Sequence, residues 1–168
     1  MIEAILWLVI NTYFESNIEP LPAQIATVQV VMNRADWKPE NVKAVIIKRK
    51  QFSWTDDPSK MKLAQGIISS GKLPDEMIPL VRVVYKAITV PFYERTIWTH
   101  YQIPGVSQRW GCWTGGVKTK IFPGSGHIFC GDLDVVKPGN TPAYIKKRAK
   151  LRAWRKRKEL SDNDRGGC

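Results

Sequence analysis

The first fifteen residues, MIEAILWLVINTYFE, would give a helix with almost no polar face. One set of apolar positions follows helical spacing and a second set fills the opposite side: Ala4, Ile5, Leu8, Val9 and Thr12, and then Leu6, Trp7 and Ile10. Such a helix has to be buried, so we expect a core helix from about Ile2 to Phe14. The segment has no basic start and no small-residue cleavage site, and it is too short to span a bilayer, so we do not expect a signal peptide.

Helical patterns continue along the first half of the chain, with Pro20 and Pro22 restarting it after the first helix. We expect helices over about residues 21–35, 38–50, 61–70 and 75–89. Their inward positions in the second and third helices are Ile25, Val28, Val31, Met32 and Ala35, and Val42, Val45 and Ile46. The stretch QFSWTDDPSK, which lacks periodicity, is expected to be a loop or a short extended segment.

From Thr96 onward the chain is rich in aromatic residues, Gly and Pro, which favours irregular loops and short strands. The residues GSG at 124–126 are typical of a tight turn. Several helices followed by loops and strands predict a mainly α fold of the α+β class, with a small irregular or β portion.

The net charge of +11 is concentrated near the end of the 168-residue chain. Residues 137–158 hold ten Lys or Arg and no acid, which leaves 16 basic and 15 acidic residues elsewhere. We therefore expect a nearly neutral domain, residues 1–136, followed by a basic and partly helical tail, residues 137–168. A tail of this kind attracts polyanions such as nucleic acid, anionic lipid or acidic wall polymers.

The end of the first apolar segment carries two carboxylates, Glu15 and Glu19. Burial disfavours the charged form of a carboxyl group and raises its pKa. A glutamic acid that stays protonated near neutral pH is what glycoside cleavage requires as a general acid. Spacing alone is equally compatible with a solvated glutamate at a helix end.

Four motifs in a fixed order help to decide between a general acid and a solvated glutamate at this helix end. They are YFESNIEPLPAQIATVQVVMNR, QFSW at Gln51 to Trp54, THYQIPGVSQRW at residues 99–110, and GSGHIFC at residues 124–130. With these motifs the chain resembles the SleB-like cell wall hydrolase family, a branch of the lysozyme-like lytic enzymes often found in phage endolysins. The resemblance covers roughly residues 1–133 and implies a lysozyme-like fold, peptidoglycan as substrate and Glu15 as the catalytic acid.

The pair Glu15-Ser16 is also similar to the Glu-Ser of lytic transglycosylases, so this resemblance favours a transglycosylase over a hydrolase. The predicted substrate-binding residues are Ser16, Glu19, Gln51, Ser53, Trp54, His100, Tyr101, Trp110 and His127. Glu19 is also a candidate for a purely structural role, Phe52 is expected in the core, and the two histidines are expected to orient groups by hydrogen bonding. Ile18 stands where the family usually has Gly, which would be strained if that turn needs a positive φ.

Other classes of function remain open at this level. His100, Cys112, His127 and Cys130 could ligate zinc, although their spacing lacks the paired short knuckles of known zinc motifs. A Cys-His pair would make the protein a wall amidase or peptidase, with Cys112 or Cys130 as the nucleophile. A non-enzymatic nucleic-acid binder would depend on the tail, but no nucleic-acid motif is present and no specific nucleic acid is expected.

Three cysteines, at 112, 130 and 168, indicate either a reducing compartment or one pair with a spare thiol. We expect no cofactor and no metal, a monomer, and bacterial peptidoglycan as the partner, with anionic membrane or wall polymers held by the tail. As a phage endolysin, the protein would accumulate in the host bacterial cytoplasm and reach the wall after release through a holin.

Overall fold

The computed structural model describes residues 1–91, 96, 98, 100–102 and 118–131. The chain divides into two units, Met1–Val136 and Lys137–Cys168, and the second unit lies wholly outside the described residues. The separation of a catalytic domain from a basic tail therefore stays a prediction. So does everything predicted for Trp110 and Cys112.

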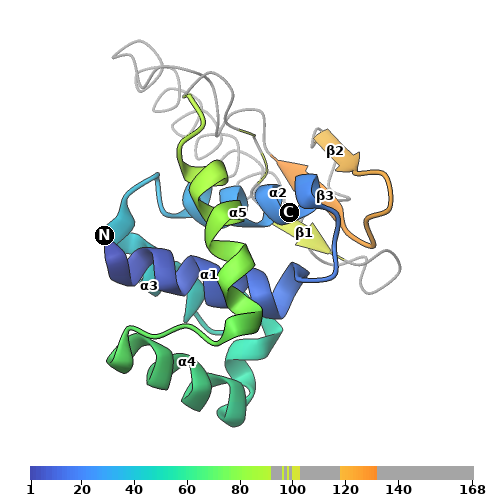
Figure 1. Ribbon diagram of the computed structural model, residues 1–168. Coiled ribbons are helices and arrows are strands. Elements are labelled where there is room, and N and C mark those ends of the chain that lie inside the picture. Colours follow the sequence, from blue (N-terminus) through green and yellow to red (C-terminus); the bar gives the residue numbers. More distant parts are fainter. Residues whose placement is uncertain (92–95, 97, 99, 103–117, 132–168) are drawn as a thin grey trace, which may run out of the picture. The chain divides into compact units, whose positions relative to one another are not determined.

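Helices dominate the described part of the chain (Figure 1). The five α-helices are α1 (Ile2–Ser16), α2 (Leu21–Arg34), α3 (Pro39–Ile46), α4 (Pro58–Ser70) and α5 (Ile78–Ile88). Two short 3-10 helices, η1 (Ser53–Asp56) and η2 (Asp75–Met77), precede α4 and α5. A small antiparallel sheet is formed by β1 (His100–Gln102), β2 (Lys118–Ile121) and β3 (Ile128–Gly131). The predicted mainly α fold with a small β portion is confirmed.

The apolar helix α1 is the centre of the helical part. It contacts α2, α3, α4 and α5, and in Figure 1 it runs between α4 below and the crossing helix α5. Its buried residues lie on every side: Ala4, Leu6, Trp7, Leu8, Val9, Ile10, Asn11, Thr12 and Ser16. The predicted buried core helix is present, and it continues two residues beyond Phe14 to include Glu15 and Ser16.

Helix α2 is buried on two sides, which the sequence pattern showed only in part. Its predicted stripe, including Val28, Val31 and Met32, packs into the main core with α1. A second set of small residues, Ala23, Ala26 and Val30, packs against Trp98 and Phe129. Because these small side chains let the sheet approach α2 closely, β1 and β3 lie against the helix that follows Glu15.

The central strand β3 pairs with β1 on one side and β2 on the other, in the order β1-β3-β2. In this register Phe129 of β3 lies opposite Tyr101 of β1 on one side and opposite Lys120 of β2 on the other. The predicted turn before β3 is present, with Gly124 at φ 77° and a hydrogen bond from the Ser125 N–H to the Phe122 carbonyl at 2.9 Å. A positive φ at Gly124 suits a residue without a Cβ.

Two boundaries differ from the prediction. Helix α4 begins at Pro58 because the Asp57 carboxylate accepts the N–H groups of Ser59 and Lys60, and Pro58 occupies the first turn. The stretch predicted as a loop thus contains η1 and the start of α4. Helix α3 ends at Ile46, earlier than its sequence pattern indicated.

The expected strain at Ile18 does not occur. The described non-glycine residues with positive φ are Asp36, Trp37 and Lys50, so Ile18 adopts an ordinary backbone conformation. Its side chain is 90% exposed beside the end of α1. None of the helices in the described ranges combines the length and the hydropathy needed to cross a bilayer.

Candidate active site

Glu15 lies in the last turn of α1, where the helix leaves the core. Its side chain is half-buried, and its Oε2 accepts a hydrogen bond of 2.8 Å from the Tyr101 hydroxyl on β1. The flanking residues are fixed to the same helix, since the hydroxyls of Thr12 and Ser16 donate to the carbonyls of Leu8 and Thr12. The fold therefore brings a carboxyl group from the first helix against the first strand.

Burial raises the pKa of the Glu15 carboxyl above its ordinary value of 4.5. The hydrogen bond from Tyr101 and the positive charges of Lys60 and Arg34 act in the opposite direction without cancelling the effect of burial. Glu15 therefore holds its proton to a higher pH than a solvated glutamate does. This is the electrostatic condition that the sequence analysis predicted for a general acid.

Two cations flank the carboxyl group. Arg34 ends α2, and its guanidinium lies 5.5 Å from the centre of the Phe52 ring. Burial lowers the pKa of Arg34, and the charges of Tyr101 and Glu15 oppose that shift. Lys60, in the first turn of α4, places its Nζ 5.6 Å from the Phe14 ring centre. Both cations favour the carboxylate form of Glu15, so they would stabilise it after it has donated its proton.

Tyr101 is held by a cluster of aromatic rings. The centres of the Phe52, His127 and Phe129 rings lie 6.4, 5.2 and 5.6 Å from its own. Burial raises the pKa of its hydroxyl well above the usual value, and the neighbouring Glu15 adds to this. Tyr101 was predicted to bind sugar, but in this structure its hydroxyl is directed at the carboxyl group.

Glu19 lies after the end of α1 and is engaged differently. Its two carboxylate oxygens accept the Gly126 N–H at 3.3 and 3.0 Å, and Oε1 lies 3.4 Å from His127 Nδ1. Gln24 donates to the Glu19 carbonyl at 2.9 Å, which fixes the backbone of the same residue. Glu19 thus ties the α1–α2 connection to the turn before β3.

The two histidines differ in burial. His127 is 8% exposed, and burial lowers the pKa of its imidazole although Glu19 opposes the shift, so His127 is neutral near pH 7. His100 begins β1 and is exposed as a residue, while partial burial of its ring and the charge of Arg34 lower its pKa. The structure therefore supports an orienting contact for His127 with Glu19, and it places His100 near the cation Arg34.

The QFSW motif supplies packing more than an exposed surface. Trp54 is 2% exposed, stacks on Phe14 at 4.9 Å, and donates from Nε1 to Asn11 Oδ1 at 3.0 Å. The predicted sugar-facing role of Trp54 does not fit this burial, because its indole ring packs inside the core and its N–H already donates to Asn11. Phe52 is 2% exposed, as expected for a core residue.

The polar residues of this motif are more accessible. Ser53 is exposed and Gln51 is half-buried, so both side chains are available to a ligand near η1. Thr55 instead donates its hydroxyl to the Phe52 carbonyl at 2.8 Å. Ser16 is 1% exposed and bonded within α1, which leaves its hydroxyl little access to substrate.

Cys130 lies in β3, is fully buried and is disulfide-bonded. Its partner lies outside the described residues. One pair with a spare thiol is therefore the arrangement that the structure supports. A half-cystine has no thiolate, so Cys130 is available neither as a nucleophile nor as a zinc ligand in this state.

Several residues of the site were not singled out from the sequence. Arg34, Asn11 and Lys60 surround Glu15 or its partner Tyr101, and Asn33 donates to the carbonyls of Thr96 and Trp98 at 2.9 and 2.7 Å. The Asn-Arg that ends α2 thus attaches the chain before β1 and supplies a cation. The Asn-Arg pair that ends the first motif was the signal that could have identified both.

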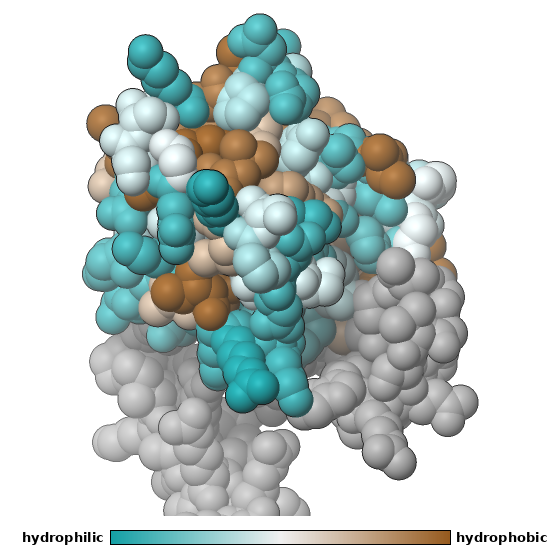
Figure 2. All heavy atoms as spheres, turned by 90° about the horizontal axis from the view of Figure 1, so that it is seen from below, coloured by the Kyte–Doolittle hydropathy of each residue, from teal (hydrophilic) through white to brown (hydrophobic). Residues whose placement is uncertain are grey.

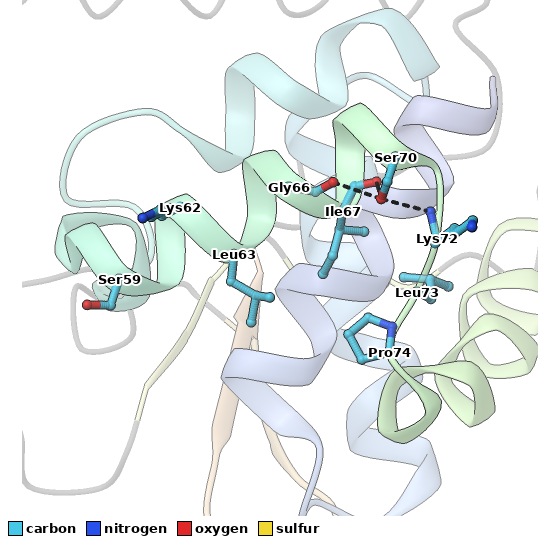
Figure 3. Close-up of a pocket in the computed structure, with 9 residues that line it drawn as sticks. All are labelled: Ser59, Lys62, Leu63, Gly66, Ile67, Ser70, Lys72, Leu73 and Pro74. Carbon is cyan, nitrogen blue, oxygen red and sulfur yellow. Dashed lines mark hydrogen bonds between the residues drawn. The ribbon is translucent and has the colours of Figure 1, made fainter.

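A groove of about 670 Å³ lies elsewhere, between α4 and the segment that leads to α5 (Figure 3). Its lining residues are Ser59, Lys62, Leu63, Gly66, Ile67, Ser70, Lys72, Leu73 and Pro74. Figure 2, a view from the α4 side, shows small apolar patches divided by polar side chains. None of the lining residues is a predicted site residue or carries a carboxyl group, so this groove is separate from the surroundings of Glu15.

A family comparison covers the segment that follows Glu15. The sequence model described as Cell Wall Hydrolase matches residues 18–130, about two thirds of the chain. The matched segment contains Glu19, Gln51, Tyr101 and His127 and begins three residues after Glu15. No curated protein and no solved structure matches the chain. The chain belongs to the cell wall hydrolase family, and it is a peptidoglycan-degrading enzyme.

Proposed function

We propose that this enzyme is a glycosidase that cleaves the β-1,4 bond between N-acetylmuramic acid and N-acetylglucosamine, with Glu15 as the general acid. One observation carries the proposal. Glu15 is a half-buried carboxyl group with a raised pKa, and its Oε2 is held by Tyr101. An acid in this state can protonate the oxygen of the leaving sugar.

A lytic transglycosylase fits the site better than a hydrolase. In that reaction Glu15 gives its proton to the glycosidic oxygen and the C1–O bond breaks. The resulting carboxylate then takes the proton of the muramyl 6-hydroxyl, whose oxygen bonds to C1 and closes a 1,6-anhydro ring. One carboxyl group serves as acid and then as base. Glu19 is already bound to Gly126 and faces His127, which favours a mechanism that does not need it.

A muramidase is the second candidate, in which a water molecule replaces the muramyl 6-hydroxyl as nucleophile. A thiol-dependent amidase is less well supported, because Cys130 is disulfide-bonded. A non-enzymatic nucleic-acid binder would not require the Glu15–Tyr101 contact at all.

Mass spectrometry of the muropeptides released from purified peptidoglycan tests the proposal. We expect products with anhydromuramic ends, each lighter by one water than the reducing-end product of a muramidase. Glu15→Gln should release neither product, whereas Glu40→Gln, a matched change at an exposed carboxylate on α3, should digest at the wild-type rate. Release of free stem peptides instead of sugars would show an amidase and contradict the proposal.

We also propose that the protein acts as a phage endolysin, reaching the wall through a holin, and that residues 137–168 anchor it to a polyanion. The resemblance of the four motifs supports the first point, and the ten cations of residues 137–158 support the second. Truncation after Leu133 should reduce activity on whole cells more than on soluble glycan fragments, and most at low salt. Equal loss on both substrates, in a protein that melts like the full chain, would contradict an anchoring role.

A further inference from the structure

The hydrogen bond between Tyr101 and Glu15 joins residues that are 86 positions apart in the sequence. Tyr101 has little freedom to break it by moving its ring, since Phe52, His127 and Phe129 pack around that ring. The strand register adds a further restraint, because Tyr101 is paired with Phe129 in the sheet. The phenol oxygen is therefore held at one place beside the carboxyl group.

A buried polar residue, Asn11, lies on α1 close to Glu15. Asn11 lies one helical turn before Glu15, on the same face, and is fully buried. Its Oδ1 accepts the indole N–H of Trp54 at 3.0 Å, which fixes the orientation of the amide. Its Nδ2 has no hydrogen bond of standard geometry to a described residue, so Asn11 is fixed by Trp54 and not by Tyr101.

We propose that Tyr101 is a positioning residue for the Glu15 acid, held in turn by the rings of Phe52, His127 and Phe129. Because the Tyr101 O–H occupies Glu15 Oε2, the acidic proton lies on Oε1, the oxygen left to face the substrate. When that proton moves to the glycosidic oxygen, the same O–H stabilises the carboxylate that remains. This inference rests on the proposed function, since it assumes that Glu15 is the acid.

A positioning role for Tyr101 predicts a change in the pKa of Glu15 that a role in packing alone does not predict. A hydrogen bond to the carboxylate favours the ionised form and lowers the pKa of Glu15 against the effect of burial. Removing the Tyr101 hydroxyl should therefore raise the pKa of Glu15 further. The alkaline limb of the pH–rate profile should then move to higher pH, while the rate falls because the developing carboxylate has lost a donor.

The first experiment compares Tyr101→Phe with Tyr85→Phe in the full chain, on soluble glycan fragments. Tyr85 lies on α5 and is 65% exposed, so its variant is a matched control for loss of a phenol hydroxyl. We expect kcat/KM of Tyr101→Phe to fall by about 10- to 100-fold, the size of a hydrogen bond to a charged group. We expect its alkaline limb to move upward and the Tyr85→Phe profile to match the wild type.

A titration of the Glu15 carboxyl carbon by NMR gives a readout that does not depend on activity. The midpoint should be higher in Tyr101→Phe than in the wild type. An unchanged midpoint would overturn the proposal, even if the rate falls, because a packing role alone would account for that fall. If Tyr101→Phe does not fold, 3-fluorotyrosine at position 101 decides, since its more acidic hydroxyl should lower the midpoint and an unchanged midpoint would again overturn the proposal.

Glu15→Gln distinguishes a failure of the proposed function from a failure of the Tyr101 proposal. Wild-type activity in that variant would contradict the glycosidase proposal. An inactive Glu15→Gln together with wild-type behaviour of Tyr101→Phe would contradict only the role of Tyr101.

Discussion

Two glutamates in the short segment ESNIE have opposite surroundings. Glu15 belongs to the last turn of α1, where burial raises its pKa and Tyr101 donates to it. Glu19 lies beyond the helix, where it accepts the N–H of Gly126 and faces His127. The first is surrounded by groups that respond to its protonation state, and the second by groups that hold two loops together.

The difference shows that two carboxyl groups four positions apart in one motif have different partners, which supports different proposed roles for them. Ionising Glu15 works against burial, so this residue costs the folded protein stability while it keeps an exchangeable proton. Glu19 is 10% exposed at its side chain and contributes stability as an acceptor for the turn before β3. Substitutions at the two positions should therefore have opposite balances of activity and stability.

The largest effect is expected for Glu15→Gln. Loss of a general acid lowers the rate by about 10²- to 10⁴-fold, because the glutamine amide cannot protonate the leaving oxygen. The measurement is the initial rate of release of soluble muropeptides, with the far-ultraviolet circular dichroism spectrum as a check of folding. Clearance of peptidoglycan by folded Glu15→Gln at the rate of Glu40→Gln would remove Glu15 from the mechanism.

The same variant should change the pH dependence of stability. The pKa of Glu15 is raised in the folded state, so the folded protein binds this proton more tightly than the unfolded chain. Its contribution to stability is present below the ordinary pKa of 4.5 and is lost as pH rises through the higher folded value. Glu15→Gln should therefore melt at a higher temperature than the wild type near neutral pH, with a difference that shrinks on acidification.

Thermal melts of both proteins across that pH range test this. A melting-temperature difference that does not vary with pH would mean that the carboxyl group is not perturbed by folding. Glu40→Gln is again the control, because Glu40 is exposed on α3.

Much of the fold could be predicted from residue patterns, and much less of the site. The apolar faces of α1 required burial, and Pro20 and Pro22 marked where α2 begins. These signals are local, since each depends on neighbours within one or two turns. The start of α4 was placed too late because the capping carboxylate of Asp57 lies inside a stretch that otherwise resembles a loop.

The site depends on contacts between distant parts of the chain. Trp54 was predicted at a sugar-binding surface, but its indole bonds to Asn11, 43 residues away. Tyr101 was predicted as a substrate-binding residue of its motif, yet nothing in the sequence shows that its hydroxyl meets Glu15. Sequence motifs identified which segments matter, and only the packing of β1 against α2 determined which side chains meet.

An intermediate effect is expected for Glu19→Gln. The amide oxygen can still accept the Gly126 N–H, but a neutral bond replaces a charge-assisted one, so we expect a loss of about 1 kcal/mol of unfolding free energy. Even if a loss of this size were added in full to the activation free energy of the reaction, the rate would fall by less than about tenfold. Denaturant unfolding and muropeptide release measure the two quantities. A loss as large as that of Glu15→Gln in activity, with unchanged stability, would reverse the assignment of the two glutamates.

The smallest effect concerns Gly126, which carries the N–H that Glu19 accepts. A Cβ at this position would lie 3.3 Å from Glu19 Oε1, so the carboxylate would have to shift by a few tenths of an ångström. Gly126 is not among the described glycines with positive φ, so alanine fits its backbone and restricts the unfolded chain, which by itself stabilises by about 0.4–1 kcal/mol. The two effects oppose each other, and we expect Gly126→Ala to be neutral or slightly destabilising.

The sign should change when the carboxylate is removed. In a Glu19→Ala background the crowding at Oε1 is gone, so Gly126→Ala should stabilise that protein by the entropic amount alone. Denaturant unfolding of the four proteins in this cycle gives the coupling between the two positions. Identical effects of Gly126→Ala in both backgrounds would mean that Glu19 does not contact this turn closely. The proposed structural role of Glu19, which is the contrast to Glu15 as an acid, would then be contradicted.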